Sequence, residues 1–231
     1  YVIEAVNGRV PIVAGIGGNN TQEVINTIRH TDFTGIDGIL SVAPYYNKPT
    51  QRGLFQHFKS IANCSPVPVI MYNVPGRTGC NLTADTCIEL AKECENIAGV
   101  KEASGDLAQI MKIIRGKPES FNVISGDDML TLPVIAAGGA GVISVLANAF
   151  PAATAELVSN ALKSNFKTAR ELQFKYLELT ELLFTEGNPA GVKAMLGILN
   201  KCQNTLRLPL VPVSRSTLTR IQKAVEEVMK G

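Results

Sequence analysis

The sequence is poor in the residues that most often bind transition metals. Its only histidines are His30 and His57, and neither stands at a spacing typical of metal ligands. Its five cysteines include no C-x-x-C pair, and their number is odd. This usage indicates reduced thiols in a cytoplasmic protein and not a disulfide framework. The sequence therefore predicts a cytoplasmic protein without a metal site.

The sequence also lacks a strong charge bias and a long apolar run. The formal net charge is +2, which is too close to neutral to predict a nucleic-acid or membrane partner. No apolar stretch approaches the length that crosses a bilayer, and no signal peptide opens the chain. With 45% apolar and 18% charged residues in 231 positions, the composition is that of a globular protein with a large core.

Short apolar segments alternate with amphipathic ones over the first 150 residues. Nearly continuous apolar strands are typical of a parallel sheet with both faces covered. The expected strands are Pro11–Ile16, Gly38–Ala43, Val67–Asn73, Ala98–Ala103, Phe121–Ser125 and Gly141–Leu146. The helices expected after them are Thr21–His30, Gln51–Asn63, Thr83–Glu95, Leu107–Arg115 and Met129–Ala137. The alternation therefore predicts six βα units.

The pattern changes at Pro151, after which amphipathic helices follow one another. The expected helices are Ala152–Lys163, Lys167–Phe184, Pro189–Lys201 and Ser214–Lys230. The apolar link Leu206–Val213 contains two prolines and is not expected to be a strand. We therefore predict an α/β region over residues 1–150 and a C-terminal helical appendage over residues 151–231.

Six βα units are two fewer than a closed TIM (β/α)8 barrel contains. Tyr1–Gly8 has the pattern of a helix that ends at a glycine, which suggests that the sequence begins inside the fold. At about 30 residues per unit, roughly 60 residues would come before it. The predicted fold is thus an α/β TIM barrel without its first two units. An open parallel sheet that binds a nucleotide is the alternative, but no phosphate-binding loop is found.

Three polar residues stand where such a barrel places its active site, at the carboxyl ends of the strands. Lys101 stands at the end of the apolar run in the fourth expected strand, and a lysine amine that burial keeps neutral can attack a carbonyl. Tyr72 ends the third, where a phenol can relay protons. Arg77 follows in a Pro-Gly turn and can hold a carboxylate. Each residue alone could be an ordinary solvated side chain, but the set predicts imine chemistry on a 2-oxo acid.

The segments around these residues resemble the motifs of one enzyme family. Tyr-Asn-Val-Pro-Gly-Arg-Thr at 72–78 and Gly-Val-Lys-Glu-Ala-Ser-Gly-Asp at 99–106 are similar to the diagnostic segments of the dihydrodipicolinate synthase / N-acetylneuraminate lyase family. Segments 44–49, 125–128, 141–148 and 206–210 also match in order and spacing. The resemblance spans the chain, and Arg77 favours the dihydrodipicolinate synthase branch over the sialic-acid lyases.

The resemblance implies a class I, Schiff-base lyase that needs no cofactor. It would condense pyruvate with L-aspartate 4-semialdehyde to 4-hydroxy-tetrahydrodipicolinate, in lysine and diaminopimelate biosynthesis. Lys101 would form the Schiff base with pyruvate, and Tyr72 would donate and accept protons. Tyr46 would belong to the same proton relay from a neighbouring subunit. The relay threonine of the family lies in a Gly-Thr-Thr-Gly-Glu segment, which these 231 residues do not contain.

The resemblance also implies substrate contacts. Arg77 would bind the carboxylate of the semialdehyde or of the cyclised adduct. Ile143, through its backbone, and Gly126 would line the pyruvate pocket. Two alternatives stay open: another pyruvate aldolase of the family, such as an N-acetylneuraminate lyase, and a non-catalytic binding or regulatory relative.

Regulation and assembly are further implications of the resemblance. Asn19, Glu23 and Tyr45 align with a site at a dimer interface where lysine inhibits family members, so a dimer or tetramer is expected. A simpler explanation exists for Asn19 and Glu23. Thr21-Gln-Glu23 opens a helix, where a capping residue and a first-turn acid are expected in any case.

Overall fold

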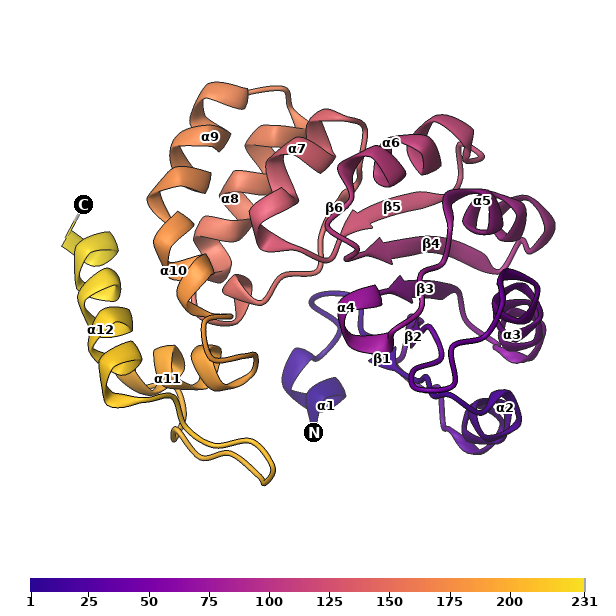
Figure 1. The fold of residues 1–231 in the computed structure, drawn as a ribbon, viewed down its shortest axis with the longest axis horizontal. Coiled ribbons are helices and arrows are strands. Elements are labelled where there is room, and N and C mark those ends of the chain that lie inside the picture. Colours follow the sequence, from indigo (N-terminus) through magenta and orange to yellow (C-terminus); the bar gives the residue numbers. More distant parts are fainter. Residues whose placement is uncertain (231) are drawn as a thin grey trace. The chain divides into compact units, whose positions relative to one another are not determined.

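The computed structural model describes residues 1–230, and these form an α/β fold (Figure 1). Two compact units make up the chain. The first contains Tyr1–Gly126 and Ala137–Ala140, and the second contains Asp127–Ala136 and the residues from Gly141 onward. Residues 151–230 contain helices and the segments that connect them. The division at residue 150 that the sequence suggests stays a prediction.

Parallel strands form the sheet of the first unit, and they are neighbours in chain order. They are β1 (Val13–Gly15), β2 (Gly38–Val42), β3 (Val69–Asn73), β4 (Ile97–Glu102) and β5 (Asn122–Ser125). Each overlaps its predicted range. Val69, Met71 and Val100 are fully buried, as expected for a sheet covered on both faces. Parallel pairing brings the carboxyl ends of the strands to one edge.

Four helices of the first unit lie along one side of this sheet (Figure 1). They are α2 (Thr21–His30), α3 (Gln51–Cys64), α5 (Ala84–Glu93) and α6 (Leu107–Gly116). Three of these helices begin with a residue whose side chain caps the first turn. The Asn20 side chain accepts a hydrogen bond from the Gln22 N–H. The side chains of Thr50 and Asp106 accept in the same way from the N–H groups of Gly53 and Gln109. Such caps satisfy backbone donors that the first turn leaves unpaired.

Two short helices complete the first unit. The helix α1 (Val2–Val6) ends in left-handed backbone at Asn7 and Gly8, close to the predicted glycine stop. The Pro-Gly turn expected at Arg77 takes the form of one helical turn, α4 (Pro75–Thr78). Proline fits the first helical position and Gly79, with φ 74°, ends the helix.

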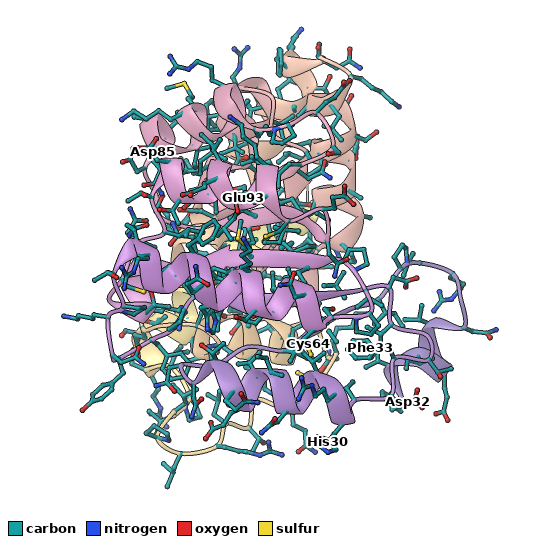
Figure 2. The ribbon with its side chains drawn as sticks, turned by 90° about the vertical axis from the view of Figure 1, so that its right-hand side faces the viewer. His30, Asp32, Phe33, Cys64, Asp85 and Glu93 are labelled. Carbon is teal, nitrogen blue, oxygen red and sulfur yellow. The ribbon has the colours of Figure 1, made fainter. Side chains whose placement is uncertain are left out.

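An apolar cluster joins α2 and α3 to the sheet. Ile28, Ile39 and Ile61 are buried in it, and Phe33 and Cys64 pack against it. Figure 2 shows Phe33 and Cys64 on the side where α2 and α3 end, with Asp85 and Glu93 marking the two ends of α5. The helices are thus held by burial of apolar surface, which stabilises by about 25 cal/mol per Å².

His57 of α3 is buried in the same layer. Its Nδ1 lies 2.8 Å from Thr21 Oγ1, and its Nε2 is buried without a hydrogen-bond partner. Burial lowers the pKa of His57 from 6.5 to about 4. A charged imidazole would carry a second N–H with no acceptor, so the folded protein keeps this ring neutral.

We expect His57 to make the fold sensitive to acid. Between pH 6.5 and about 4 the unfolded chain binds more protons at this residue than the folded chain. The free energy of unfolding therefore falls as the pH falls through this window, by up to about 3 kcal/mol. Denaturant titrations at several pH values should show a flatter pH dependence for His57→Gln. The exposed His30, changed to glutamine, is the control that should keep the wild-type slope, and equal slopes in all three proteins would contradict the assignment.

The second unit is mainly helical. Its elements are η1 (Asp128–Leu130), α7 (Thr131–Ala136), β6 (Gly141–Val142), η2 (Leu146–Asn148), α8 (Pro151–Leu162), α9 (Phe166–Lys175), α10 (Leu177–Leu182), α11 (Ala190–Ile198) and α12 (Arg215–Lys230). Leu182, Met195 and Ile221 are fully buried in an apolar cluster formed by α10, α11 and α12. No helix within residues 1–230 has the length and apolar character needed to span a bilayer.

Three elements of the second unit differ from the predicted ones. The strand expected at Gly141–Leu146 stops at Val142, because Asp128 accepts hydrogen bonds from the Ser144 hydroxyl and the Val145 N–H and bends the chain away. The helix expected from Met129 begins as the 3₁₀ turn η1. The single helix expected at Lys167–Phe184 is interrupted at Tyr176, whose ψ of 6° separates α9 from α10.

Candidate active site at the ends of β3 and β4

Lys101 and Tyr72 face each other across two neighbouring strands. They are direct partners in the parallel register of β4 and β3. The Lys101 Nζ lies 4.1 Å from the centre of the Tyr72 ring. Both residues are partly buried, and the Lys101 amine lies against the Tyr72 ring. An amine over an aromatic face at this distance is in van der Waals and electrostatic contact with it.

The phenol of Tyr72 keeps its proton at neutral pH. Burial raises the pKa of Tyr72 above its ordinary value of 10.0, and the positive charge of Arg77 opposes that shift in part. Arg77, in α4, is therefore near enough to the phenol for their charges to interact. The three residues that the sequence grouped come from the ends of two strands and the helix that follows β3.

Gly126 lies directly against the side chain of Lys101. Its N–H donates to the Glu102 carbonyl oxygen over 2.7 Å, which holds the end of β5 beside β4. A Cβ at position 126 would lie 2.6 Å from the Ala103 Cβ and 3.1 Å from both Cγ and Cε of Lys101. Only glycine therefore lets the lysine side chain keep its place without a shift of its neighbours.

The Tyr45–Tyr46 loop rests on the segment that follows Arg77. The N–H of Tyr46 donates to the Thr78 carbonyl oxygen over 3.3 Å, and the Cys80 Sγ lies 2.9 Å from the Pro44 carbonyl oxygen. Tyr46 has a left-handed backbone with φ 74°, and its residue surface is 88% exposed. Such a conformation is strained for a bulky residue. The loop thus presents the Tyr46 side chain outward.

Asn19, Glu23 and Tyr45 line one cavity of about 230 Å³. The Asn19 side chain donates to the Tyr45 carbonyl oxygen over 3.2 Å, which connects the start of α2 to the tyrosine loop. The residue that caps α2 is Asn20. Helix capping therefore explains Asn20 and not Asn19, whose side chain is held by its hydrogen bond to Tyr45.

The family model for the Dihydrodipicolinate synthetase family matches residues 1–228. This chain belongs to the dihydrodipicolinate synthetase family. The resemblance predicted from the motifs around Tyr72 and Lys101 is confirmed.

Relatives within the family match nearly the whole chain. The 4-hydroxy-tetrahydrodipicolinate synthase of Azobacteroides pseudotrichonymphae is 53% identical over 224 residues, which are 97% of this chain and 76% of the relative. The crystal structure of a family member from Cyanidioschyzon merolae has lysine bound, and that of the chloride-inhibited synthase from Acinetobacter baumannii is a complex with pyruvate. Both share 39% identity with this chain at a TM-score of 0.94, and the match covers 99% of this chain and 78% of each of theirs.

Within this family fold, Ile143 and Gly126 belong to separate units. Ile143 directly follows β6 in the second unit and is partly buried. Gly126 belongs to the first unit. Lys101, Tyr72 and Arg77 also lie in the first unit, as do the residues of the tyrosine loop. A role for Ile143 in the substrate pocket stays a prediction.

A group of buried and partly buried polar residues behind Lys101 was not expected from the motifs. Asn73 and Asn81 join Glu102 and Gln109 in one hydrogen-bonded network. A signal was present in the sequence, since an asparagine and a glutamate both occur in apolar strands where a buried polar group needs partners. Their pairing depends on the register between β3 and β4, which the sequence alone does not specify.

Proposed function

We propose that this protein is a 4-hydroxy-tetrahydrodipicolinate synthase, a lyase of lysine and diaminopimelate biosynthesis. It condenses pyruvate with L-aspartate 4-semialdehyde. The observation that carries this proposal is the contact between Lys101 and Tyr72, with the Nζ 4.1 Å from the ring centre, in a chain that belongs to the dihydrodipicolinate synthetase family.

The chemistry begins at the Lys101 amine. The neutral amine attacks the ketone carbon of pyruvate, and loss of water gives an imine. Loss of a methyl proton converts the imine to an enamine, whose carbon attacks the aldehyde carbon of the semialdehyde. The amino group of the semialdehyde then attacks the imine carbon, and ring closure releases the lysine. The Tyr72 phenol, which burial keeps protonated at neutral pH, donates and accepts the protons.

Arg77 and the walls of the pocket select the substrates. Arg77 binds a carboxylate of the semialdehyde or of the cyclised adduct, because a guanidinium offers paired donors in a planar fork. Its electrostatic effect on Tyr72 supports a place beside the reacting carbons. Gly126 lines the pyruvate side of Lys101.

The proposed fold and assembly include more than this chain. The proposed full fold is an eight-unit barrel with a C-terminal helical appendage, in keeping with the longer relatives, of which this chain spans about three quarters. The proposed assembly is a homo-oligomer in which Tyr46 completes the proton relay of a neighbouring subunit. The outward placement of Tyr46, with 88% of its surface exposed, supports this role.

Borohydride trapping tests the proposed function. The protein is incubated with pyruvate and sodium borohydride, and its peptides are analysed by mass spectrometry. A reduced pyruvate adduct is expected on Lys101, and added aspartate semialdehyde should yield the cyclic product. N-acetylmannosamine in place of the semialdehyde should give no product, which separates this activity from a sialic-acid lyase. A protein that forms no lysine adduct would support the binding-only alternative.

Gly126→Ala should slow imine formation. The new Cβ would lie 3.1 Å from two carbons of the Lys101 side chain and displace them. A misplaced reacting group costs about 10- to 100-fold in rate, which trapping of the pyruvate adduct over time would measure. Gly15→Ala, with no atom within 4 Å of its new Cβ, should react at the wild-type rate. Normal trapping by Gly126→Ala would mean that Gly126 is no wall of the pocket.

The cavity lined by Asn19, Glu23 and Tyr45 is the proposed site for feedback inhibition by lysine. Glu23 offers a carboxylate to the ligand's ammonium group. Glu23→Gln should weaken inhibition about 10-fold, the loss expected for one charge-assisted hydrogen bond of about 1.5 kcal/mol. Activity without lysine should not change. Gln22→Ala, a neighbouring exposed position on α2, should be inhibited like the wild type, and equal inhibition of the Glu23 variant would refute the site.

A further inference from the structure

We propose that Glu102 is a positioning residue that holds Lys101 and Tyr72 in their reactive arrangement. This inference rests on the proposed function. Glu102 is the residue after Lys101 in β4, and only 1% of its surface is exposed. Burying a carboxylate costs several kcal/mol unless hydrogen bonds compensate it. A buried carboxylate beside the proposed Schiff-base lysine therefore calls for an explanation.

Two cross-strand pairs lie back to back at the ends of β3 and β4. Tyr72 pairs with Lys101, and the next residues, Asn73 and Glu102, pair with each other. Successive side chains of a strand point to opposite faces. The Asn73–Glu102 pair therefore lies on the face opposite Lys101, where Gln109 of α6 covers it. Asn73 and Glu102 are the direct chain neighbours of Tyr72 and Lys101. A shift of the backbone at Asn73 or Glu102 therefore also displaces Tyr72 or Lys101.

Three residues donate hydrogen bonds to the Glu102 carboxylate. The Ser104 N–H donates to Oε1 over 2.8 Å. The Asn73 Nδ2 donates to both oxygens, at 3.2 and 3.0 Å, and the Gln109 Nε2 donates to Oε2 over 3.2 Å. These three donors can all be satisfied by a carboxylate, which offers two oxygens with about four lone-pair sites.

The orientation of the two amides is determined by backbone groups of Leu82. The Leu82 N–H donates to the Asn73 Oδ1 over 2.9 Å, so the Asn73 Nδ2 must point to Glu102. The Leu82 carbonyl oxygen accepts from the Gln109 Nε2 over 3.3 Å, which fixes that amide too. Neither amide can rotate to offer an oxygen without losing its bond to Leu82. A glutamine at position 102 would therefore place its own N–H group against one of the N–H donors that bind the Glu102 carboxylate.

The network also reaches the segment that follows Arg77. Asn81 accepts from the Asn73 Nδ2 over 2.8 Å and exchanges hydrogen bonds with Gln109 at 2.8 and 3.2 Å. Asn81 and Leu82 lie shortly after α4, the helix that contains Arg77. Glu102 thus joins β3, β4, the start of α6 and the segment after α4. Through these contacts it holds the strand ends that carry the lysine and the phenol, although it touches no substrate.

The test compares single substitutions with a polarity exchange. Glu102→Gln and Asn73→Asp should each slow borohydride trapping of the pyruvate adduct about 10- to 100-fold, as expected for misplaced reacting groups. In the double variant, the carboxylate introduced at position 73 can accept from both the Leu82 N–H and the amide introduced at position 102. The exchange therefore restores the donor–acceptor contact between positions 73 and 102, although it does not restore every contact of the wild-type network with Ser104, Asn81 and Gln109. The trapping rate of the double variant should recover at least several-fold from the slower single variant. Glu93→Gln, an exposed glutamate of α5, is the control that should keep the wild-type rate.

The outcomes separate this inference from the proposed function. A wild-type protein that forms no adduct would refute the function. A wild-type protein that reacts while Glu102→Gln reacts equally fast would overturn the positioning role. Residues in contact can also rescue each other's stability, so trapping is measured well below the melting temperature of every variant, where a simple loss of stability would leave the rate of the folded protein unchanged. If Glu102→Gln does not fold, Glu102→Asp is used instead. Its side chain keeps the negative charge but is one methylene shorter, so the carboxylate lies farther from its donors. A wild-type trapping rate in that variant would refute the positioning role.

Discussion

Lys101→Arg should abolish imine formation and lower the rate of condensation by about 1,000-fold or more, since the covalent route is lost. A guanidinium stays protonated and has no free electron pair with which to attack a carbonyl. Its positive charge can still occupy the face of the Tyr72 ring, where the Lys101 Nζ lies 4.1 Å from the centre. The substitution therefore removes the nucleophile with little change in packing. Initial rates with pyruvate and aspartate semialdehyde, together with the mass of the borohydride-treated protein, measure the effect.

Lys193→Arg provides the matched control. Lys193 is a partly buried lysine inside α11, and its substitution should leave the rate and the adduct unchanged. Melting temperatures of both variants should stay close to that of the wild type. A Lys101→Arg protein that still forms a pyruvate adduct would place the Schiff base on another lysine.

Tyr72→Phe should lower kcat by about 100- to 10,000-fold, the range of a positioned general acid and base. The phenyl ring retains the surface that Lys101 lies over, so pyruvate should still form a trapped adduct at a reduced rate. The KM for pyruvate should change little, because the lost hydroxyl acts on protons in the transition state and not on bound pyruvate. Steady-state kinetics of the condensation and time courses of trapping distinguish the two effects.

Tyr176→Phe is the control for this substitution. Tyr176 is also a partly buried tyrosine whose pKa burial raises, but it lies in the second unit between α9 and α10. Its hydroxyl should be dispensable for the reaction. Equal kcat values for Tyr72→Phe and the wild type would remove the phenol from the proposed proton relay.

Much of the fold follows from local sequence patterns. Runs such as Val69–Met71 and Ile97–Val100 are apolar on consecutive positions, which predicts strands buried on both faces. The helices between them show caps that a local pattern can reveal, as Thr50 and Asp106 do. Local sequence patterns gave the wrong end of a strand where a residue from another part of the chain bends the backbone. Asp128 ends β6 through Ser144 and Val145, residues far along the sequence.

The candidate site divides in the same way. Sequence motifs identified Lys101, Tyr72 and Arg77 as one set, because their chemistry is complementary and each stands at or just after the carboxyl end of a strand in a parallel sheet. No motif contains the register that pairs Tyr72 with Lys101 and Asn73 with Glu102. The contact of Gly126 with Lys101 likewise exists only after β5 has paired with β4.

By itself, the sequence determined the succession of strands and helices, the family, and the residue types available for imine chemistry. These properties can be read along the chain, since hydrophobic periodicity and the order of motifs depend only on the order of the residues. The tertiary structure alone decided the distance from amine to phenol, the cavity that gathers Asn19, Glu23 and Tyr45, and the donors that surround Glu102. Each depends on strand register and helix packing, which bring together groups that the chain keeps apart.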